Sequence, residues 1–454
     1  MKKTEKKTAA LHNLGCKVNA YEMEAMQQQL EQAGYEIVPF EPGADVYVIN
    51  TCSVTNMADR KSRQMLHKAK KMNPNAVIVA TGCYVQTAAE RTGLAVEADI
   101  ILGNNKKKEL VQALEAYRQE QGGSETEICQ ESQVHRDIID INHTKEYEEL
   151  SISRTEEHTR AYIKVQDGCN QFCSYCIIPY ARGRARSRSL SEVSAEVRRL
   201  AESGVREVVL TGIHLSSYGT DQGTDLLSLI RAVHEIERID RIRLGSLEPG
   251  IVTEEFAQAL SRLPKMCPHF HLSLQSGCDT VLQRMNRRYN TAEYLLRCEI
   301  LRKYFDHPAL TTDVIVGFPG ETEEEFAQTV EFLKKVRFYE THIFKYSRRE
   351  GTRAARMPQQ ITETVKGERS DVLLELNRQN KAEFERSWIE KQVQVLLEEK
   401  DFLNGAEYYT GYTKEYIRVA VAAMPGEQRE NQICEGILLK ADLPEGYLLL
   451  QPSC

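Results

Sequence analysis

Residues 168–176 read Gly-Cys-Asn-Gln-Phe-Cys-Ser-Tyr-Cys and place Cys169, Cys173 and Cys176 in a C-x3-C-x2-C spacing. Three thiolates occupy three of the four iron corners of a 4Fe-4S cube and leave the fourth iron open. Structural zinc sites and ordinary ferredoxin clusters close that position with a fourth protein ligand, and this run holds no nearby His or further Cys to do so. The motif therefore indicates a cluster that binds a small molecule at its open iron, with a zinc knuckle or buried reduced thiols as the alternatives.

Three further cysteines each follow a strand-like run in the first 120 or so residues. Cys16 follows the run 8–14, Cys52 follows 46–49 and Cys83 follows 76–80, and helical stretches separate these runs. Alternating strands and helices build a parallel sheet whose strand C-termini share one edge, which is where open α/β sheets bind ligands. We therefore expect the three thiols to meet there and to hold a second 4Fe-4S cluster, although any one of them alone reads as a small buried residue.

A second strand–helix series runs from about residue 160 to residue 346. Its six strand candidates are 161–165, 207–210, 242–247, 269–275, 310–316 and 342–346. Six strands suit a partial (β/α)6 barrel rather than a closed eight-stranded one, with the chemistry at the C-terminal strand ends. Gly212, Ser246 and Gln275 lie at such ends, where they serve either a ligand pocket or the turns themselves.

Beyond Thr352 the strand–helix alternation stops. A helical stretch leads to short strand candidates at 392–397, 408–412, 417–421, 433–440 and 447–451, which predict a small antiparallel β-barrel. The chain is thus expected to be an α/β protein of several parts: an open parallel α/β domain at 1–122, a linker at 123–159, the partial barrel at 160–350, a helical bridge at 351–387 and the small barrel at 388–454.

The net charge of the chain argues against a protein that binds nucleic acid through an overall positive charge. There are 59 Lys and Arg against 66 Asp and Glu, a net charge of −7, so any contact with RNA depends on local patches. Arginines alternate in the segment 182–188, which is either a solvated charge run or a strip that follows phosphates beside the first cysteine motif. Residues 388–454 carry 6 basic and 11 acidic side chains, which makes the small barrel a poor general RNA binder.

The sequence also sets an expectation for the cellular location. It contains no uninterrupted run of about 18 apolar residues and no apolar segment after its basic start. We therefore expect a cytoplasmic protein with no membrane partner, in which the 12 cysteines are reduced ligands and core residues rather than disulfides.

These motifs together resemble the radical S-adenosylmethionine (SAM) enzymes and, among them, the methylthiotransferases. The likeness is carried by residues 14–19 (LGCKVN), 50–55 (NTCSVT), 81–84 (TGCY), 167–184, 274–277 (LQSG), 285–289 (MNRRY) and 312–322 (TDVIVGFPGET). The resemblance implies an N-terminal three-cysteine domain, a radical SAM barrel and a C-terminal TRAM domain, the β-barrel that docks tRNA in this family. It further implies SAM and two 4Fe-4S clusters: one on Cys169, Cys173 and Cys176 that cleaves SAM to a 5′-deoxyadenosyl radical, and one on the N-terminal cysteines that carries the sulfur to be transferred.

The same resemblance suggests roles for individual residues. Tyr175 is expected near the SAM adenine, and Gly212, Ser246, Gln275 and Asp313 in the SAM or substrate pocket.

The resemblance also bears on the substrate. Residues 15–19 are most similar to the branch that methylthiolates N6-threonylcarbamoyladenosine next to the tRNA anticodon, whereas the branch for isopentenyl-adenosine usually has Gln and Met in place of Lys17 and Val18. The expected enzyme is therefore a tRNA methylthiotransferase that needs an external electron donor and sulfur source. The alternatives are the isopentenyl-adenosine substrate, an aspartate of a ribosomal protein, which suits an acidic barrel, and a non-enzymatic iron-sulfur or zinc protein that binds RNA.

Overall fold

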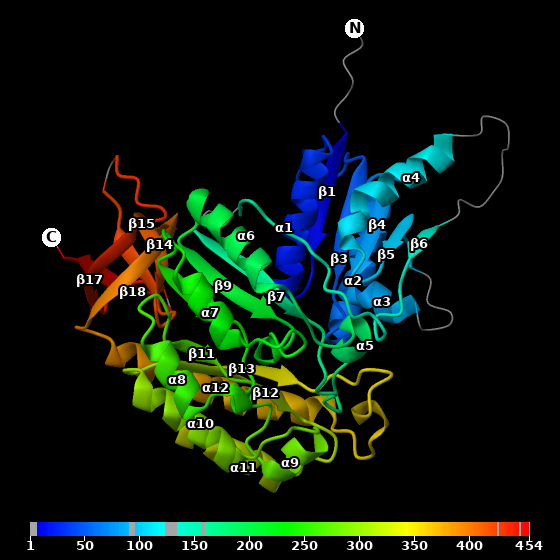
Figure 1. Ribbon diagram of the computed structural model, residues 1–454. Coiled ribbons are helices and arrows are strands. Elements are labelled where there is room, and N and C mark those ends of the chain that lie inside the picture. Colours follow the sequence, from blue (N-terminus) through cyan, green and yellow to red (C-terminus); the bar gives the residue numbers. More distant parts are fainter. Residues whose placement is uncertain are drawn as a thin grey trace.

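The computed structural model describes residues 7–89, 96–122, 134–155, 159–424, 426–444 and 446–453. Part of the predicted linker, at 123–133 and 156–158, lies outside these ranges. Figure 1 shows an N-terminal sheet in blue and cyan beside a curved sheet in green and yellow, with a small red and orange barrel at the far side of the curved sheet. Three sheet-based units therefore follow one another along the chain.

The N-terminal unit is a six-stranded parallel sheet in the order β2-β1-β3-β4-β5-β6, as the alternation of strands and helices predicted. One face packs on α1 and α4 and the other on α2 and α3, so that the central strand β3 is buried at every position. The strands are β1 (Thr8–Asn13), β2 (Glu36–Ile37), β3 (Val46–Thr51), β4 (Val77–Gly82), β5 (Ile100–Leu102) and β6 (His135–Asp137); the helices are α1 (Lys17–Gln32), α2 (Asn56–Met72), α3 (Cys83–Ala89), η1 (Lys107–Glu109) and α4 (Leu110–Gly122).

The central unit is a curved sheet of six parallel strands, which confirms the partial (β/α)6 prediction. Single bridges from Ile242 to Met266 and from Leu247 to Leu272 join its two halves, β7-β9-β10 and β11-β12-β13, and β8 pairs antiparallel with β7 at one edge. The strands are β7 (Arg160–Asp167), β8 (Arg186–Ser187), β9 (Glu207–Gly212), β10 (Arg241–Leu244), β11 (His269–His271), β12 (Ala309–Val316) and β13 (Glu340–Lys345). The helices are α5 (Ile178–Arg182), α6 (Leu190–Glu202), α7 (Leu226–His234), α8 (Glu254–Ser261), α9 (Asp279–Arg284), α10 (Thr291–Tyr304) and α11 (Glu323–Val336), with 3-10 turns at Leu215–Ser217, Pro249–Ile251 and Ala354–Arg356.

Side-chain alternation along β7 separates the core from the concave face of this sheet. Ala161, Ile163 and Val165 pack into the main hydrophobic core with the surrounding helices. Because successive side chains of a strand point to opposite faces, Tyr162 and Lys164 lie on the concave side. That side is polar and is the side that α1 of the N-terminal unit approaches (Figure 1).

The C-terminal unit is a closed five-stranded barrel in the order β14-β15-β16-β18-β17, reached through the long helix α12 (Glu363–Ser387). Its strands are β14 (Gln392–Leu403), β15 (Ala406–Thr413), β16 (Arg418–Ala422), β17 (Ile433–Leu439) and β18 (Leu448–Pro452). The predicted small antiparallel barrel is confirmed with one exception, because β16 and β18 pair in parallel and close the barrel. The likeness of this barrel to a TRAM domain stays a prediction.

Two arginines of β10 fasten the small barrel to the central unit. Arg241 donates to the Tyr412 carbonyl at 2.7 Å and Arg243 donates to the Lys414 carbonyl at 2.9 Å. The small barrel therefore sits at the N-terminal ends of the central strands, opposite the ends that carry the cysteine motif. Among the described residues, no helix has both the length and the apolar character to cross a membrane.

Candidate metal centres

The loop from Gly168 to Cys176 leaves the C-terminal end of β7 and is held tightly by the segment that follows it. Gly168 has φ +72°, and a Cβ there would lie 1.9 Å from the Arg184 carbonyl oxygen, so only glycine fits. The Cys169 amide donates to the Gly183 carbonyl at 3.0 Å, and the Cys176 amide donates to the Cys173 carbonyl at 3.0 Å. The backbone thus folds the three predicted ligands into one short loop.

The thiols of this loop are suited to a metal rather than to free thiolate chemistry. Burial raises the pKa of Cys169 to about 11 and that of Cys176 to about 12, so without a metal both are protonated at neutral pH. Arg287 donates through Nη1 to the Cys173 sulfur at 3.1 Å, and its Nη2 pairs with Glu248 at 2.7 Å. A cluster that replaced the thiol protons would meet a hydrogen-bond donor already in place, which fits an iron-sulfur group.

The structure brings the N-terminal cysteines together from three strand ends. Cys16 precedes α1, Cys52 follows β3 and Cys83 follows β4. A Cβ at Gly15 would lie 3.1 Å from the Cys52 sulfur, and burial together with the neighbouring Cys83 and Cys16 thiols raises the pKa of Cys52 to about 11. That these cysteines bind a cluster stays a prediction, but the convergence that it requires is present.

Arg182 joins the two cysteine sets. It ends α5, a helix of 5 residues that starts two positions after Cys176. Its Nε donates to the Cys83 sulfur at 3.2 Å, and its Nη1 lies 2.8 Å from Glu22 and 3.1 Å from Asp167. One buried guanidinium therefore contacts the N-terminal cysteine set, α1 and the end of β7.

The expected phosphate-following strip at 182–188 is wrong. Arg182, Arg186 and Arg188 are buried, and in that segment only Arg184 has an exposed guanidinium-bearing side chain. The physical reason is a set of buried carboxylates that need cations: Arg188 pairs with Glu196, Arg182 with Glu22, and Arg186 lies 3.8 Å from Asp167. These buried arginines neutralise carboxylates of the protein, and Arg182 and Arg188 also contact Glu22 and Tyr21 of α1.

A second contact fixes the N-terminal unit over the central one. Arg349, in the loop after β13, donates to Ser53 at 2.7 Å and pairs with Asp59 at 2.8 Å. Ser53 directly follows Cys52, so this arginine orients the Cys52 loop from the central unit. Together Arg182 and Arg349 hold the N-terminal cysteine edge against the C-terminal strand ends of the curved sheet.

The predicted pocket residues have different surroundings. Tyr175 packs edge-on against Phe318, with ring centroids 6.4 Å apart, and burial raises the pKa of its phenol well above the ordinary value. Ser246 is exposed at the end of β10. Gly212 lies against Gln166, because a Cβ there would approach that side chain to 2.9 Å.

Gln275 and Asp313 are adjacent through their backbones. Gln275 has φ +73°, and its amide donates to the Asp313 carbonyl at 2.8 Å, which gives it a local structural role. The Asp313 carboxylate lies 3.4 Å from His271 Nε2, and the polar atoms of these two residues and His342 lie within 4.8 Å of one another. Asp313 is thus part of a polar cluster.

Sequence reasoning missed several residues of this region. Arg287, Glu248 and Arg349 carry no spacing signal that distinguishes them from surface charges. Arg287 lies within a stretch that supported the family resemblance, which is the one hint that the sequence offered. Their roles depend on contacts across more than 30 residues of chain, such as the 39 residues between Glu248 and Arg287.

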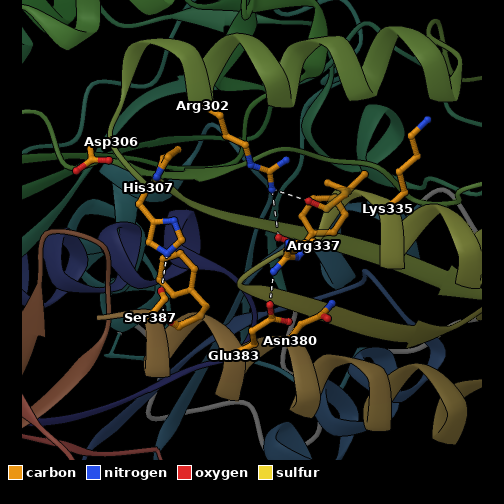
Figure 2. Close-up of a pocket in the computed structure, with 12 residues that line it drawn as sticks. Arg302, Asp306, His307, Lys335, Arg337, Asn380, Glu383 and Ser387 are labelled. Carbon is orange, nitrogen blue, oxygen red and sulfur yellow. Dashed lines mark hydrogen bonds and ion pairs between the residues drawn. The ribbon is translucent and has the colours of Figure 1, made fainter. Parts of the chain in front are cut away.

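A separate pocket of about 490 Å³ lies away from the cysteines (Figure 2). It is lined by Arg302, His307, Arg337 and Glu383 among others, at the N-terminal ends of β12 and β13. Arg337 pairs with Glu383, and Arg302 donates to the Val336 carbonyl. The pocket lies at the end of the barrel that serves stability rather than chemistry.

Comparison with known proteins agrees with this geometry. Residues 163–333 match the Radical SAM superfamily and residues 8–103 match the uncharacterized protein family UPF0004. The chain is 41% identical to the threonylcarbamoyladenosine tRNA methylthiotransferase MtaB of Bacillus subtilis, over 96% of this chain and 95% of that protein. It is 35% identical to the tRNA-2-methylthio-N(6)-dimethylallyladenosine synthase of Methylacidiphilum infernorum, over 88% of this chain and 85% of that protein.

Solved structures show the same fold at low sequence identity. The radical SAM methyltransferase TsrM of Kitasatospora setae, solved with cobalamin and a [4Fe-4S] cluster, superposes with a TM-score of 0.54 at 15% identity. The superposition covers 75% of this chain and 72% of that one. The central curved sheet and its helices are therefore a radical SAM fold.

Proposed function

Since this chain belongs to the tRNA methylthiotransferases of the radical SAM superfamily, we propose that it converts N6-threonylcarbamoyladenosine next to the tRNA anticodon into its 2-methylthio derivative. The observation that carries the proposal is that Arg182 links the two three-cysteine sets. Its guanidinium contacts Cys83, and Arg182 itself ends the short helix that follows the Cys176 loop. Each set offers three thiols, which leaves one coordination position of a 4Fe-4S cluster for SAM or sulfur.

The chemistry of the substrate explains why such an apparatus is needed. Carbon 2 of adenine carries an aromatic C–H whose proton is not acidic enough for a general base among these side chains to remove. When bound, SAM and the two clusters supply a radical that abstracts this hydrogen and a methylthio group that replaces it. The chain would then have to bring both clusters within reach of the same carbon of the base.

Particular residues serve that task. We propose Cys169, Cys173 and Cys176 as ligands of the SAM-cleaving cluster, with Arg287 donating to Cys173 and held by Glu248. We propose Cys16, Cys52 and Cys83 as ligands of the sulfur-carrying cluster, with Arg182 donating to Cys83.

We keep Tyr175, Gly212, Ser246, Gln275 and Asp313 as pocket residues in this proposal. The edge-on packing of Tyr175 on Phe318 and the polar cluster of Asp313 with His271 support two of them. We also take the domain limits at 122, 159, 350 and 387, a cytoplasmic location, and an external electron donor and sulfur source as parts of the same proposal.

Mass spectrometry of tRNA nucleosides tests the substrate. Deleting the gene should remove the 2-methylthio derivative of threonylcarbamoyladenosine. Threonylcarbamoyladenosine without the methylthio group should take its place. Persistence of the methylthio nucleoside would overturn the substrate assignment, and loss of 2-methylthio-dimethylallyladenosine instead would favour the other tRNA branch.

A purified sample tests the cofactors. Anaerobic reconstitution should give about eight irons per chain and reductant-dependent formation of 5′-deoxyadenosine from SAM. Zinc without SAM cleavage would reject the enzyme in favour of a nucleic-acid-binding zinc protein.

A further inference from the structure

Lys17 carries an ammonium group for which the described residues supply no anion. It is the first residue of α1, directly after Cys16, and its side chain is exposed. Its Nζ lies 5.9 Å from the centroid of the Tyr162 ring, on the concave face of β7. Within the ranges that the structure describes, no carboxylate lies within 4.0 Å of this ammonium.

The surroundings of Lys17 are positively charged. Arg160 and Arg243 are the cations whose charges act on it most strongly. The nearby carboxylate of Glu207 is already engaged, because Arg160 Nε lies 2.6 Å from it and Arg243 Nε lies 3.0 Å from it. A concave surface with unbalanced positive charge attracts an anionic ligand.

The position of Lys17 limits which part of a ligand can reach it. Lys17 follows Cys16 in the chain, and its side chain extends from the N-terminal cysteine set into the interior of the curved sheet, toward the ring of Tyr162. In the proposed function, on which this step depends, carbon 2 of the substrate adenine must approach that set. The N6 substituent of the same base then lies only a few bonds away and ends in the carboxylate of threonine.

We propose that the Lys17 ammonium binds the threonine carboxylate of the threonylcarbamoyl group and so selects this nucleoside. The Tyr162 ring lies 5.9 Å from the ammonium, and the engaged arginines keep the region positive without competing for the carboxylate. The dimethylallyl group named for the relative from Methylacidiphilum infernorum has no charge and gives Lys17 no partner. Lys17 is a specificity residue, whereas the cysteines hold the chemistry.

The first test uses the wild-type holoenzyme and two substrates. One is an anticodon stem-loop with threonylcarbamoyladenosine, and the other is the same stem-loop with the threonine carboxylate as its methyl ester. A charge-assisted contact of this kind is worth about 1.5–3 kcal/mol, so kcat/KM for the acid should exceed that for the ester by about 10- to 100-fold. Equal values for acid and ester would overturn the inference and leave the proposed function intact.

The second test asks whether Lys17 causes this preference. Lys17→Gln should lower kcat/KM for the acid by about 10- to 100-fold, leave that for the ester nearly unchanged, and so abolish the preference. Lys17→Arg, which keeps the charge, should retain much of it. Lys303→Gln is a matched control, because Lys303 is exposed on the outer side of the barrel and pairs with Glu254.

Two measurements separate this role from others. Iron content and 5′-deoxyadenosine formation without tRNA should be the same in Lys17→Gln as in the wild type, since the substrate carboxylate is absent from both assays. An equal loss of kcat/KM for the acid and the ester would overturn the inference, and so would slower methyl transfer from SAM in the absence of tRNA. Either result would assign Lys17 to the cluster or to the SAM carboxylate. Failure of the wild type to modify either stem-loop would instead defeat the proposed function itself.

Discussion

The Nε atom of Arg182 lies 3.2 Å from the sulfur of Cys83, across 99 residues of sequence. Arg182 belongs to the helix that follows the Cys169–Cys176 loop, whereas Cys83 begins the helix after β4 of the N-terminal sheet. One buried side chain therefore links the N-terminal cysteine set to the segment that follows the other set. The contact explains how two domains with separate cores keep their sulfur ligands in register.

Replacing Arg182 should separate the two sets. Arg182→Met keeps the volume but removes the cation that Glu22 and Asp167 share, which costs about 3 kcal/mol of unfolding free energy. It also removes the donor to Cys83, so we expect the iron content to fall from about eight toward about four per chain. Denaturant unfolding and iron analysis after reconstitution measure both effects.

Arg184→Met is the matched control for that variant. Its guanidinium is exposed and lies 4.5 Å from the centroid of the Phe172 ring, so its removal should change stability by less than about 1 kcal/mol. An Arg182→Met protein with full iron content and unchanged unfolding would refute the bridging role.

The two cysteine sets should fail in different ways. Cys173→Ala removes a ligand of the SAM-cleaving cluster and should abolish 5′-deoxyadenosine formation, because the open iron disappears with the cluster. Cys52→Ala should spare cleavage and stop methylthiolation. Chromatography of the nucleoside products measures both, and equal loss of cleavage in the two variants would contradict separate roles.

Arg287 should tune the SAM-cleaving cluster. A hydrogen bond to a cluster ligand sulfur favours the reduced state, because the added electron increases the negative charge on sulfur. Arg287→Met removes the donor at 3.1 Å from Cys173 and should make the reduction potential more negative and SAM cleavage slower. A redox titration followed by electron paramagnetic resonance measures this shift, and Arg288→Met, at an exposed neighbouring position, should leave the potential unchanged.

The strand ends could be predicted from the sequence, whereas the burial of the arginines could not. Hydrophobic runs followed by Cys16, Cys52 and Cys83 locate three strand ends, because both the run and the parallel topology are local patterns. The contacts of Arg182 and Arg188 with α1 are not local: Glu22 lies 160 residues from Arg182, and Tyr21 lies 167 residues from Arg188. The sequence of a segment with alternating arginines is the same whether phosphates or buried carboxylates neutralise its charges, so sequence alone does not distinguish the two environments.

Strand pairing within the small barrel had a similar limit. Five short strands with turn signals predict the barrel itself, and the sheet confirms it. A closed ring of five strands must contain a parallel pair, but the period of a strand does not specify which pair, so the pairing of Val419 with Leu448 had no signal. Closure of the barrel imposes it, because β16 and β18 are the edges left to pair.

Glu207 should make the stability of the protein depend on pH. Burial acts to raise the pKa of this carboxyl, but Arg243, Arg160 and Arg241 outweigh it and hold the pKa well below 4.5. A depressed pKa in the folded state contributes stability above about pH 4.5 and loses it as the pH falls toward the folded value. Acid should therefore weaken the protein progressively below about pH 4.5.

Glu207→Gln isolates that contribution. At pH 7 the variant should be about 3–5 kcal/mol less stable, since it leaves buried arginines without a carboxylate. The difference from the wild type should shrink as the pH falls below about 4.5, because the wild type then protonates Glu207. Urea unfolding at several pH values measures it, and Glu331→Gln, at an exposed helix position, should follow the wild type throughout.

The groove beside the Cys52 loop should bind the tRNA backbone in place of the segment 182–188. It has a volume of about 590 Å³ and is lined by Arg63, Arg348 and Arg356, all exposed, at the end of the molecule that carries the cysteines. Each phosphate that an arginine neutralises releases counterions, so removing that arginine weakens binding for all sequences and lowers the salt dependence of the affinity.

Arg348→Gln with Arg356→Gln should reduce tRNA affinity and lower the slope of log K against log salt by about one for each phosphate that is no longer bound. Arg198→Gln, exposed on α6, should bind as the wild type does, and an unchanged slope in the double variant would place the RNA elsewhere.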